Sequence, residues 1–196
     1  MSTKQNQKIL RMVELAMLTA LIVVLQLIGG FFKVGPVNLS FVLVPIVIGA
    51  VLLGPSGGAF LGGVFGLVVT VMSATGMDPT GVVLWGINPF LAALICMLKG
   101  IVAGLCSGLV YKAIPKKGIF GTAVAAVCAP IINTGLFIAG VALFFNDTLH
   151  EWAGGNNMLV YIITVLCGLN FLIEFCINLV LAPAMTTIIN VISVKK

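Results

Sequence analysis

The stretch from Arg11 to Gly30, RMVELAMLTALIVVLQLIGG, is the first of several long apolar runs in this chain. A helix needs roughly 20 residues to cross a bilayer, and this run has that length, with its basic residues on the N-terminal side. Because lipid cannot hydrogen-bond to the backbone, membrane spans are helices or closed barrels. The whole sequence is 61% hydrophobic and 8% charged, and its runs lack strand-like alternation. We therefore predict an all-α, polytopic membrane protein.

The chain is predicted to form a single transmembrane domain, because no polar stretch is long enough to build a soluble one. Glycine and proline mark the breaks between the apolar runs. Six helical spans are expected, at residues 9–30, 39–53, 58–74, 88–112, 119–145 and 158–192. The second run is short, so we expect it to be buried or kinked, and Pro183 is expected to end or kink the last span. Residues 75–88 and 146–157 are expected to be loops, the first with a candidate helical core at 82–85.

Small residues repeat at intervals of four, which marks helix faces that pack closely against other helices. Two glycine sets have this spacing, and they are Gly58, Gly62 and Gly66, then Gly100, Gly104 and Gly108. Ala16 and Ala20 share a face of the first run in the same way. This alanine face has two interpretations, a tight contact inside the protein or a docking face for a separate membrane subunit.

Basic residues gather on one side of the predicted six-span arrangement. Eight of the ten bases fall there, and they are Lys4, Lys8, Arg11, Lys112, Lys116, Lys117, Lys195 and Lys196. Positive charge is retained on the cytoplasmic side of a membrane, so we predict that both termini are cytoplasmic. The breaker-rich segments 31–40 and 75–88 then face outside.

Two charged residues are predicted to lie at similar depth within spans. Lys99 stands roughly 16 Å from the outer end of its span at 1.5 Å per residue, and Glu174 lies at a comparable depth. An ionised side chain there costs at least ~2.5–3.5 kcal/mol, so an ion pair between the two is predicted. The pair has two interpretations, since it can tie two spans together or point into a substrate cavity.

Further polar residues extend this pattern. Asn88 stands three helical turns from Lys99, Asn170 and Asn178 flank Glu174 at intervals of four, and Asn133 follows Pro130 at mid-span. They predict a polar lining between the last three spans. Its apolar walls, as in other small-molecule sites, would come from Trp85, Phe90 and Phe137.

Patterns typical of catalysis or metal binding are not found in the sequence. There is no GxxxxGK[ST] nucleotide loop, HExxH motif or Ser/His/Asp set, so no catalytic residue is predicted and we do not expect an enzyme. The five cysteines lie in apolar runs without CxxC spacing, and His150 has no second ligand in view. No metal site and no cofactor is therefore expected. The net charge of +5 lies at the ends of spans, so nucleic acid is not an expected partner.

Several of these features occur together in one known family. They are the basic N-terminus before Ala16-xxx-Ala20, the motif LLGPSGGAFLGGVFG around the turn at 54–57, and the long outer segment before residue 88. With six spans in a chain of this length, the sequence resembles the substrate-binding (S) component of energy-coupling factor (ECF) vitamin transporters.

The resemblance implies a subunit that binds a vitamin from outside and docks through Ala16 and Ala20 onto a transmembrane coupling subunit, driven by two cytoplasmic ATPase subunits. It also implies that the subunit topples in the lipid bilayer to release its substrate inward. The family site lies in the outer half, above Lys99 and Glu174. Carried over to this chain, the substrate-binding residues are Lys33, Asn38, Asp78, Trp85, Asn88, Asn133 and Asn170.

Pantothenate is the favoured substrate, because amide and lysine groups suit a small, flexible ligand that bears a carboxylate. Riboflavin or another micronutrient comes next, since few aromatic residues are placed to stack on a flavin ring. The alternative from another class is a stand-alone, ion-coupled secondary transporter that uses Lys99 and Glu174. The expected location is a bacterial cell membrane.

Overall fold

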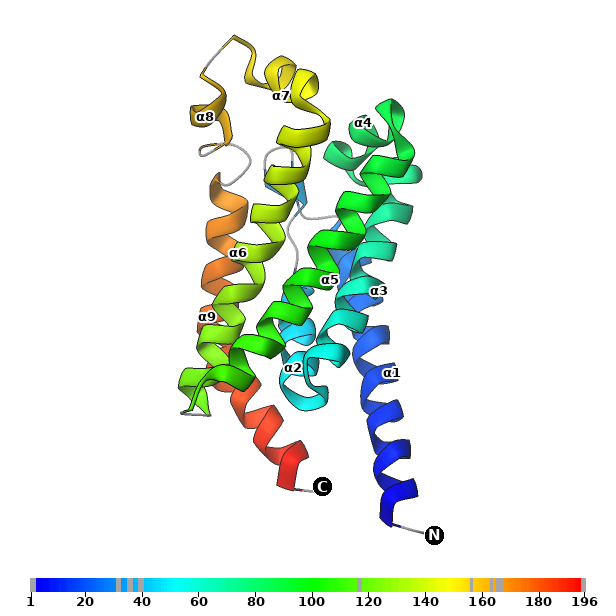
Figure 1. Ribbon diagram of the computed structural model, residues 1–196, viewed down its shortest axis with the longest axis vertical. Coiled ribbons are helices and arrows are strands. Elements are labelled where there is room, and N and C mark those ends of the chain that lie inside the picture. Colours follow the sequence, from blue (N-terminus) through cyan, green and yellow to red (C-terminus); the bar gives the residue numbers. More distant parts are fainter. Residues whose placement is uncertain are drawn as a thin grey trace.

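The computed structural model is a bundle of long helices with short helices at one end (Figure 1). It describes residues 3–30, 33–34, 37–38, 41–115, 118–155, 157–162, 164 and 168–194. In that part of the chain, five helices are long and apolar enough to cross a membrane. They are α1 (Thr3–Gly29), α3 (Pro55–Ala74), α5 (Pro89–Ala113), α6 (Ile119–Phe144) and α9 (Gly168–Val194).

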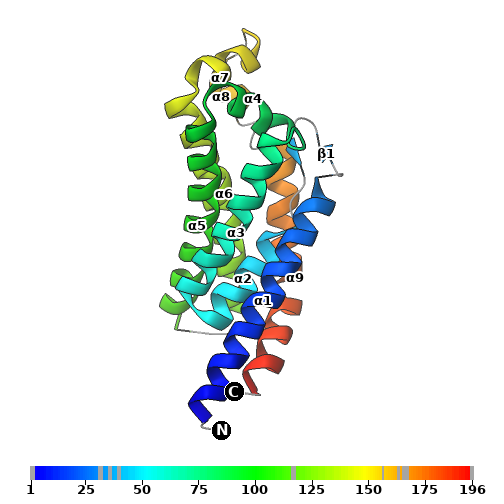
Figure 2. The same cartoon turned by 90° about the vertical axis from the view of Figure 1, so that its right-hand side faces the viewer.

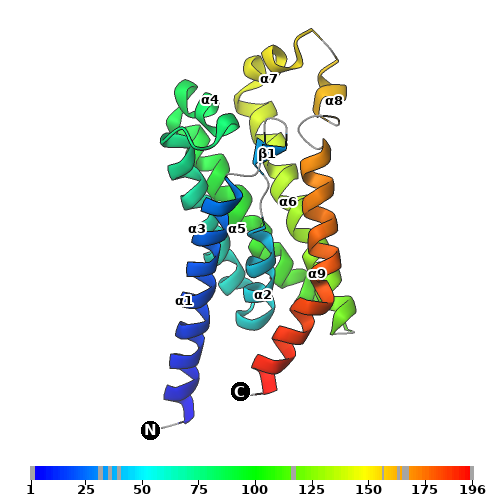
Figure 3. The same cartoon turned by 180° about the vertical axis from the view of Figure 1, so that it is seen from behind.

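A sixth apolar helix, α2 (Leu43–Leu53), is shorter and lies inside the bundle. Figure 3 shows it between α1 and α9. Seven of its eleven residues are buried, which confirms the expectation of a buried second run. Pro45 falls in its first turn, where the missing backbone N–H breaks no helical hydrogen bond. The helix ends at Gly54, whose φ of 85° suits glycine, and Pro55 begins α3.

The close-packing glycine faces are confirmed, and they face each other across α3 and α5. A Cβ atom added at Gly62 would meet the backbone of Gly100, and one added at Gly58 would meet the backbone of Gly104. These contacts fix the register of two antiparallel helices whose backbones touch. Such close approach is possible because glycine has no side chain.

Two predicted loop segments each contain a helix at the far end of the bundle from the termini (Figure 2), one expected and one not. The helical core expected within 75–88 is present as α4 (Pro79–Ile87). Residues 146–157, expected to be a loop, instead contain α7 (Asn146–Ala153). Its buried Leu149 and Ala153 are four residues apart, and this spacing gives a short helix one apolar face.

The last predicted span is also corrected. Within residues 158–192 the structure describes α8 (Met158–Tyr161) and α9, and several residues between the two helices lie outside the described part of the chain. Pro183 does not end the span, since α9 continues to Val194. Proline is tolerated in membrane helices where neighbouring groups satisfy the backbone.

The segment between α1 and α2 contains two short strands. β1 (Lys33–Val34) and β2 (Val37–Asn38) pair antiparallel, with Lys33 opposite Asn38. The turn expected at 35–36 lies outside the described residues.

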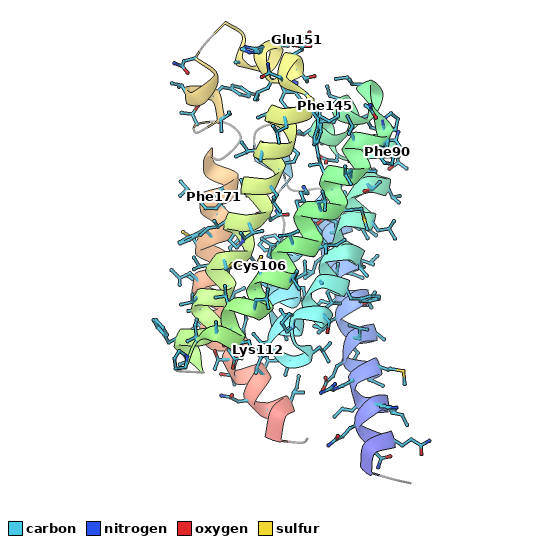
Figure 4. All side chains as sticks on the ribbon, viewed as in Figure 1. Phe90, Cys106, Lys112, Phe145, Glu151 and Phe171 are labelled. Atoms are coloured by element: carbon cyan, nitrogen blue, oxygen red, sulfur yellow. The ribbon has the colours of Figure 1, made fainter. Side chains whose placement is uncertain are left out.

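The beginning of α1 and the end of α9 lie at the same end of the bundle (Figure 1). Figure 4 shows Lys112 near this end and Glu151 at the opposite end. The described charges are therefore distributed as the sequence predicts, with bases near the termini and the acidic residues of α7 at the other end.

Buried apolar residues form two clusters along the bundle. The first, here the α2 core, includes Ile22, Ile46, Leu61, Phe65 and Met185. The second, here the cap core, joins α4 and α7 to the long helices. Its buried members are Leu84, Ala92, Ile95, Val141, Phe145 and Leu149.

Candidate functional site

A positive charge lies among aromatic rings within the bundle. The Nζ of Lys99, on α5, is 4.9 Å from the ring centroid of Phe137 on α6 and 5.8 Å from that of Phe65 on α3. Cations within about 6 Å of a ring face are attracted by its quadrupole. Phe65 belongs to the α2 core and Phe137 packs against the cap core, so Lys99 lies where the two clusters meet.

The packing of α5 on α6 indicates which side of α6 carries Asn133. A Cβ added at Gly140 of α6 would lie 2.8 Å from the side chain of Ile95 on α5. Because the two helices are antiparallel, Lys99, one turn after Ile95 on α5, is level with Phe137, about one turn before Gly140 on α6. Asn133 stands four residues from Phe137 and shares its face of α6. The amide of Asn133 therefore lies on the same side of α6 as the lysine charge.

Among the predicted site residues, Asn133 most clearly has a buried polar atom that could accept a further hydrogen bond. It is 7% exposed, and its Oδ1 has no hydrogen-bond partner among the described residues. A buried polar group without a partner costs free energy. An amide oxygen in this state is suited to accept a hydrogen bond from a ligand.

The expected polar stripe on α9 is buried as well. Glu174 is 2% exposed and Asn178 is fully buried. The Nδ2 of Asn178 donates to the backbone carbonyl of Glu174 over 2.8 Å. The Oδ1 of Asn178 has no hydrogen-bond partner in the part of the chain described here. Asn170 lies in the first turn of α9, and its side chain is outside the described residues.

Three further predicted residues lie on or beside α4. Asp78 immediately precedes Pro79, the first residue of α4, and lies within electrostatic range of the Cys96 thiol, as does Lys99. Trp85 packs against the cap core. Asn88 caps α5, because its Oδ1 accepts a hydrogen bond from the backbone N–H of Leu91 at 3.2 Å. The capping role gives Asn88 a purpose that does not involve a ligand.

The groups in this arrangement are suited to binding a ligand. A lysine ammonium can donate hydrogen bonds to a carboxylate, and an amide oxygen can accept one from a hydroxyl or amide. In the described part of the chain, no group of three or more His, Cys, Asp and Glu side chains is placed to hold a metal ion. The chemistry therefore fits a small organic anion with hydrogen-bonding groups.

Comparison with known proteins decides the family. The family model of the ECF transporter substrate-specific component matches residues 10–186. The chain belongs to this family. The S component is also 30% identical, over 184 residues, to the pantothenic acid transporter PanT of Lactococcus lactis subsp. cremoris (strain MG1363), with 87% of this chain and 88% of that protein covered. The family is one of transporters and not of enzymes, and with its apolar helices this S component is a multi-pass membrane protein.

The remaining sequence predictions for the site fall on less described parts of this S component. The backbones of Lys33 and Asn38 are brought together as a pair between β1 and β2, while their side chains are outside the described residues. The ion pair between Lys99 and Glu174 stays a prediction, since the contacts seen at the lysine Nζ are with two rings.

The buried polar residues that the sequence did not single out include Glu14, Gln26 and Thr122. Glu14 is 8% exposed and Gln26 is 6% exposed, although both lie in α1, which is the least buried of the five candidate membrane spans. Gln26 contacts the Sδ of Met72 at 3.7 Å. In the sequence each of these three polar residues stands within an apolar run, and this pattern is the signal that could have identified them.

Ala16 and Ala20 are both exposed on α1. A groove of about 590 Å³ lies beside them, between α1, α2 and α9. It is lined almost entirely by apolar side chains, including Ala20, Met17 and Ile188. Among the described residues both alanines stay exposed, which argues against a tight contact inside the protein.

Proposed function

We propose that this S component captures pantothenate and passes it to an ECF module that imports it with energy from ATP. The proposal depends above all on Lys99 and Asn133, which place a cation and an available amide oxygen on one side of α6. The similarity to a pantothenic acid transporter supports the same substrate. Riboflavin is the next candidate.

The chemistry of pantothenate fits these groups. The molecule is short and flexible, with a carboxylate at one end, an amide in the middle and hydroxyls at the other end. The resemblance implies a site above Lys99, but the ring contacts place its ammonium where the α2 core meets the cap core. From there Lys99 would bind the carboxylate through a charge-assisted hydrogen bond, and Asn133 would accept from the amide or a hydroxyl. The remaining expected contacts are Lys33, Asn38, Asp78, Trp85 and Asn170. Asn88 serves this site through the start of α5.

The proposed energy source is a set of separate subunits. A transmembrane coupling subunit would dock on the α1 face, where Ala16 and Ala20 leave room for a close helix approach. The apolar groove beside Ala20 would extend that surface onto α2 and α9. Two cytoplasmic ATPase subunits would drive the cycle. By the positive-inside rule, the basic end with both termini would face the cytoplasm in a cell membrane, with α2 as the sixth span.

Ligand analysis tests the substrate. Protein purified from cells grown in rich medium should carry pantothenate, identified by mass spectrometry after denaturation. Calorimetric titration of the ligand-free protein should give tight binding of pantothenate and much weaker binding of riboflavin. Co-purification of a flavin, with no heat of binding for pantothenate, would contradict the proposal.

A further inference from the structure

The strongest unassigned feature is the pair of rings around the Lys99 ammonium. Phe65 and Phe137 come from α3 and α6, which flank α5. Both ring centroids lie within the range of a cation–π contact, at 5.8 and 4.9 Å from Nζ. A single long side chain is therefore held from two sides by residues of two other helices.

This kind of support differs from an ion pair in one important respect. A carboxylate partner would neutralise the lysine charge and occupy its N–H donors. A ring face attracts the cation through its quadrupole and leaves those donors available. The ammonium can thus be fixed in position and still be ready to bind an incoming anion.

The rings themselves are well anchored. Phe65 is 2% exposed and belongs to the α2 core, while Phe137 packs against the cap core. A lysine has a flexible four-carbon stem, which would otherwise let its ammonium group occupy many positions. Rings locked by packing reduce that freedom before the ligand arrives, and pre-organisation of this kind favours binding.

We propose that Phe65 and Phe137 are positioning residues that hold the Lys99 ammonium as the receptor for the substrate carboxylate. They thereby set the preference of the protein for an acid over a neutral analogue of the same shape. The inference rests on the proposed function, because it takes Lys99 as part of the substrate site.

The test varies the charge distribution of one ring and keeps its size nearly constant. Phe137 is the better target, since it is half-buried and its replacement disturbs the core less than that of Phe65. Phenylalanines with one, two and three ring fluorines, which weaken the quadrupole stepwise, replace Phe137 in the full chain. Titration calorimetry then measures the affinity for pantothenate and for its alcohol analogue, in which CH₂OH replaces the carboxylate.

The expected result is a stepwise fall in the ratio of the two affinities, reaching about three- to tenfold with three fluorines, as a cation–π contact of ordinary strength predicts. Phe137→Leu should lower the ratio in the same direction. Fluorination of Phe144, which is on the same helix and 50% exposed, should leave the ratio unchanged. In a Lys99→Met background the ratio should be close to one and insensitive to fluorination.

Two failures can be told apart. If the unmodified protein does not bind pantothenate, the proposed function fails and this inference fails with it. If the unmodified protein binds pantothenate in preference to the alcohol but the ratio does not change with fluorination of Phe137, the positioning role alone is overturned. A purely structural role for Phe137 would lower both affinities together and leave their ratio constant.

Discussion

At the scale of single residues, the structure separates two asparagines that the sequence treats alike. Asn133 has a buried oxygen without a described hydrogen-bond partner, whereas Asn88 uses its oxygen to cap α5. We expect Asn133→Ala to weaken pantothenate binding roughly tenfold, the worth of about one hydrogen bond, with little change in stability. Calorimetry and thermal unfolding of the purified protein measure the two effects.

Asn88→Ala should show the opposite pattern. Loss of a helix cap costs about 1 kcal/mol of stability, so the melting temperature should fall more than the affinity does. Asn88→Asp is the matched control, because aspartate also caps helices and should preserve stability. If Asn88→Ala and Asn133→Ala lost the same affinity at unchanged stability, both residues would have to be assigned to the ligand site, which would contradict the capping role of Asn88.

At the scale of elements, the contact of α3 with α5 depends on glycine at particular positions. A Cβ at Gly62 would meet the backbone of Gly100, which cannot rotate away, whereas one at Gly63 would lie 3.5 Å from the side chain of Ile101. Gly62→Ala should therefore destabilise the protein by about 1–3 kcal/mol through overpacking. The melting temperature in detergent measures this effect.

The neighbouring Gly63→Ala is the control for this prediction. It adds the same methyl group in ordinary contact and should be neutral, or stabilising by up to about 1 kcal/mol, because alanine favours a helix over glycine. If both variants melt alike, the helices are not held at the distance that the structure shows.

At the scale of the whole molecule, the exposed face of α1 predicts dependence on a partner. The double substitution Ala16→Trp with Ala20→Trp should abolish uptake by the complete transporter and leave pantothenate binding to the isolated S component intact. Both alanines are exposed, so large side chains fit the isolated fold but would hold a partner helix away. Radiolabelled uptake in cells and calorimetry on the purified subunit measure the two quantities.

Ala139→Trp is the matched control, since Ala139 is also exposed but lies on α6, and it should leave uptake intact. The S component alone in sealed vesicles should not accumulate pantothenate, with or without an ion gradient. Accumulation driven by a gradient would favour the stand-alone secondary transporter with Lys99 and Glu174 as its ion relay.

Much of the architecture follows from the sequence, because lipid imposes simple rules. Long apolar runs have to form helices, and four of the six expected spans (9–30, 58–74, 88–112 and 119–145) coincide with a long helix to within six residues at either end. The glycine spacing predicted two close-packing faces. Burial of the short second run followed from its length. The helix α7 was missed because its polar residues outnumber its apolar ones, and its helical form depends on a face buried against the cap core.

The sequence by itself determined that the protein is a helical membrane protein and where most of its long helices lie, since these depend on local composition and helical spacing. The sequence also predicted polar residues for a ligand site, but only the tertiary structure decided what contacts those residues make. It placed Lys99 between two rings from other helices, left the oxygen of Asn133 available and used that of Asn88 as a cap. The reason is physical, because a side chain's partners come from helices distant in sequence, and the register in which these helices pack is set by contacts such as that of Ile95 with Gly140.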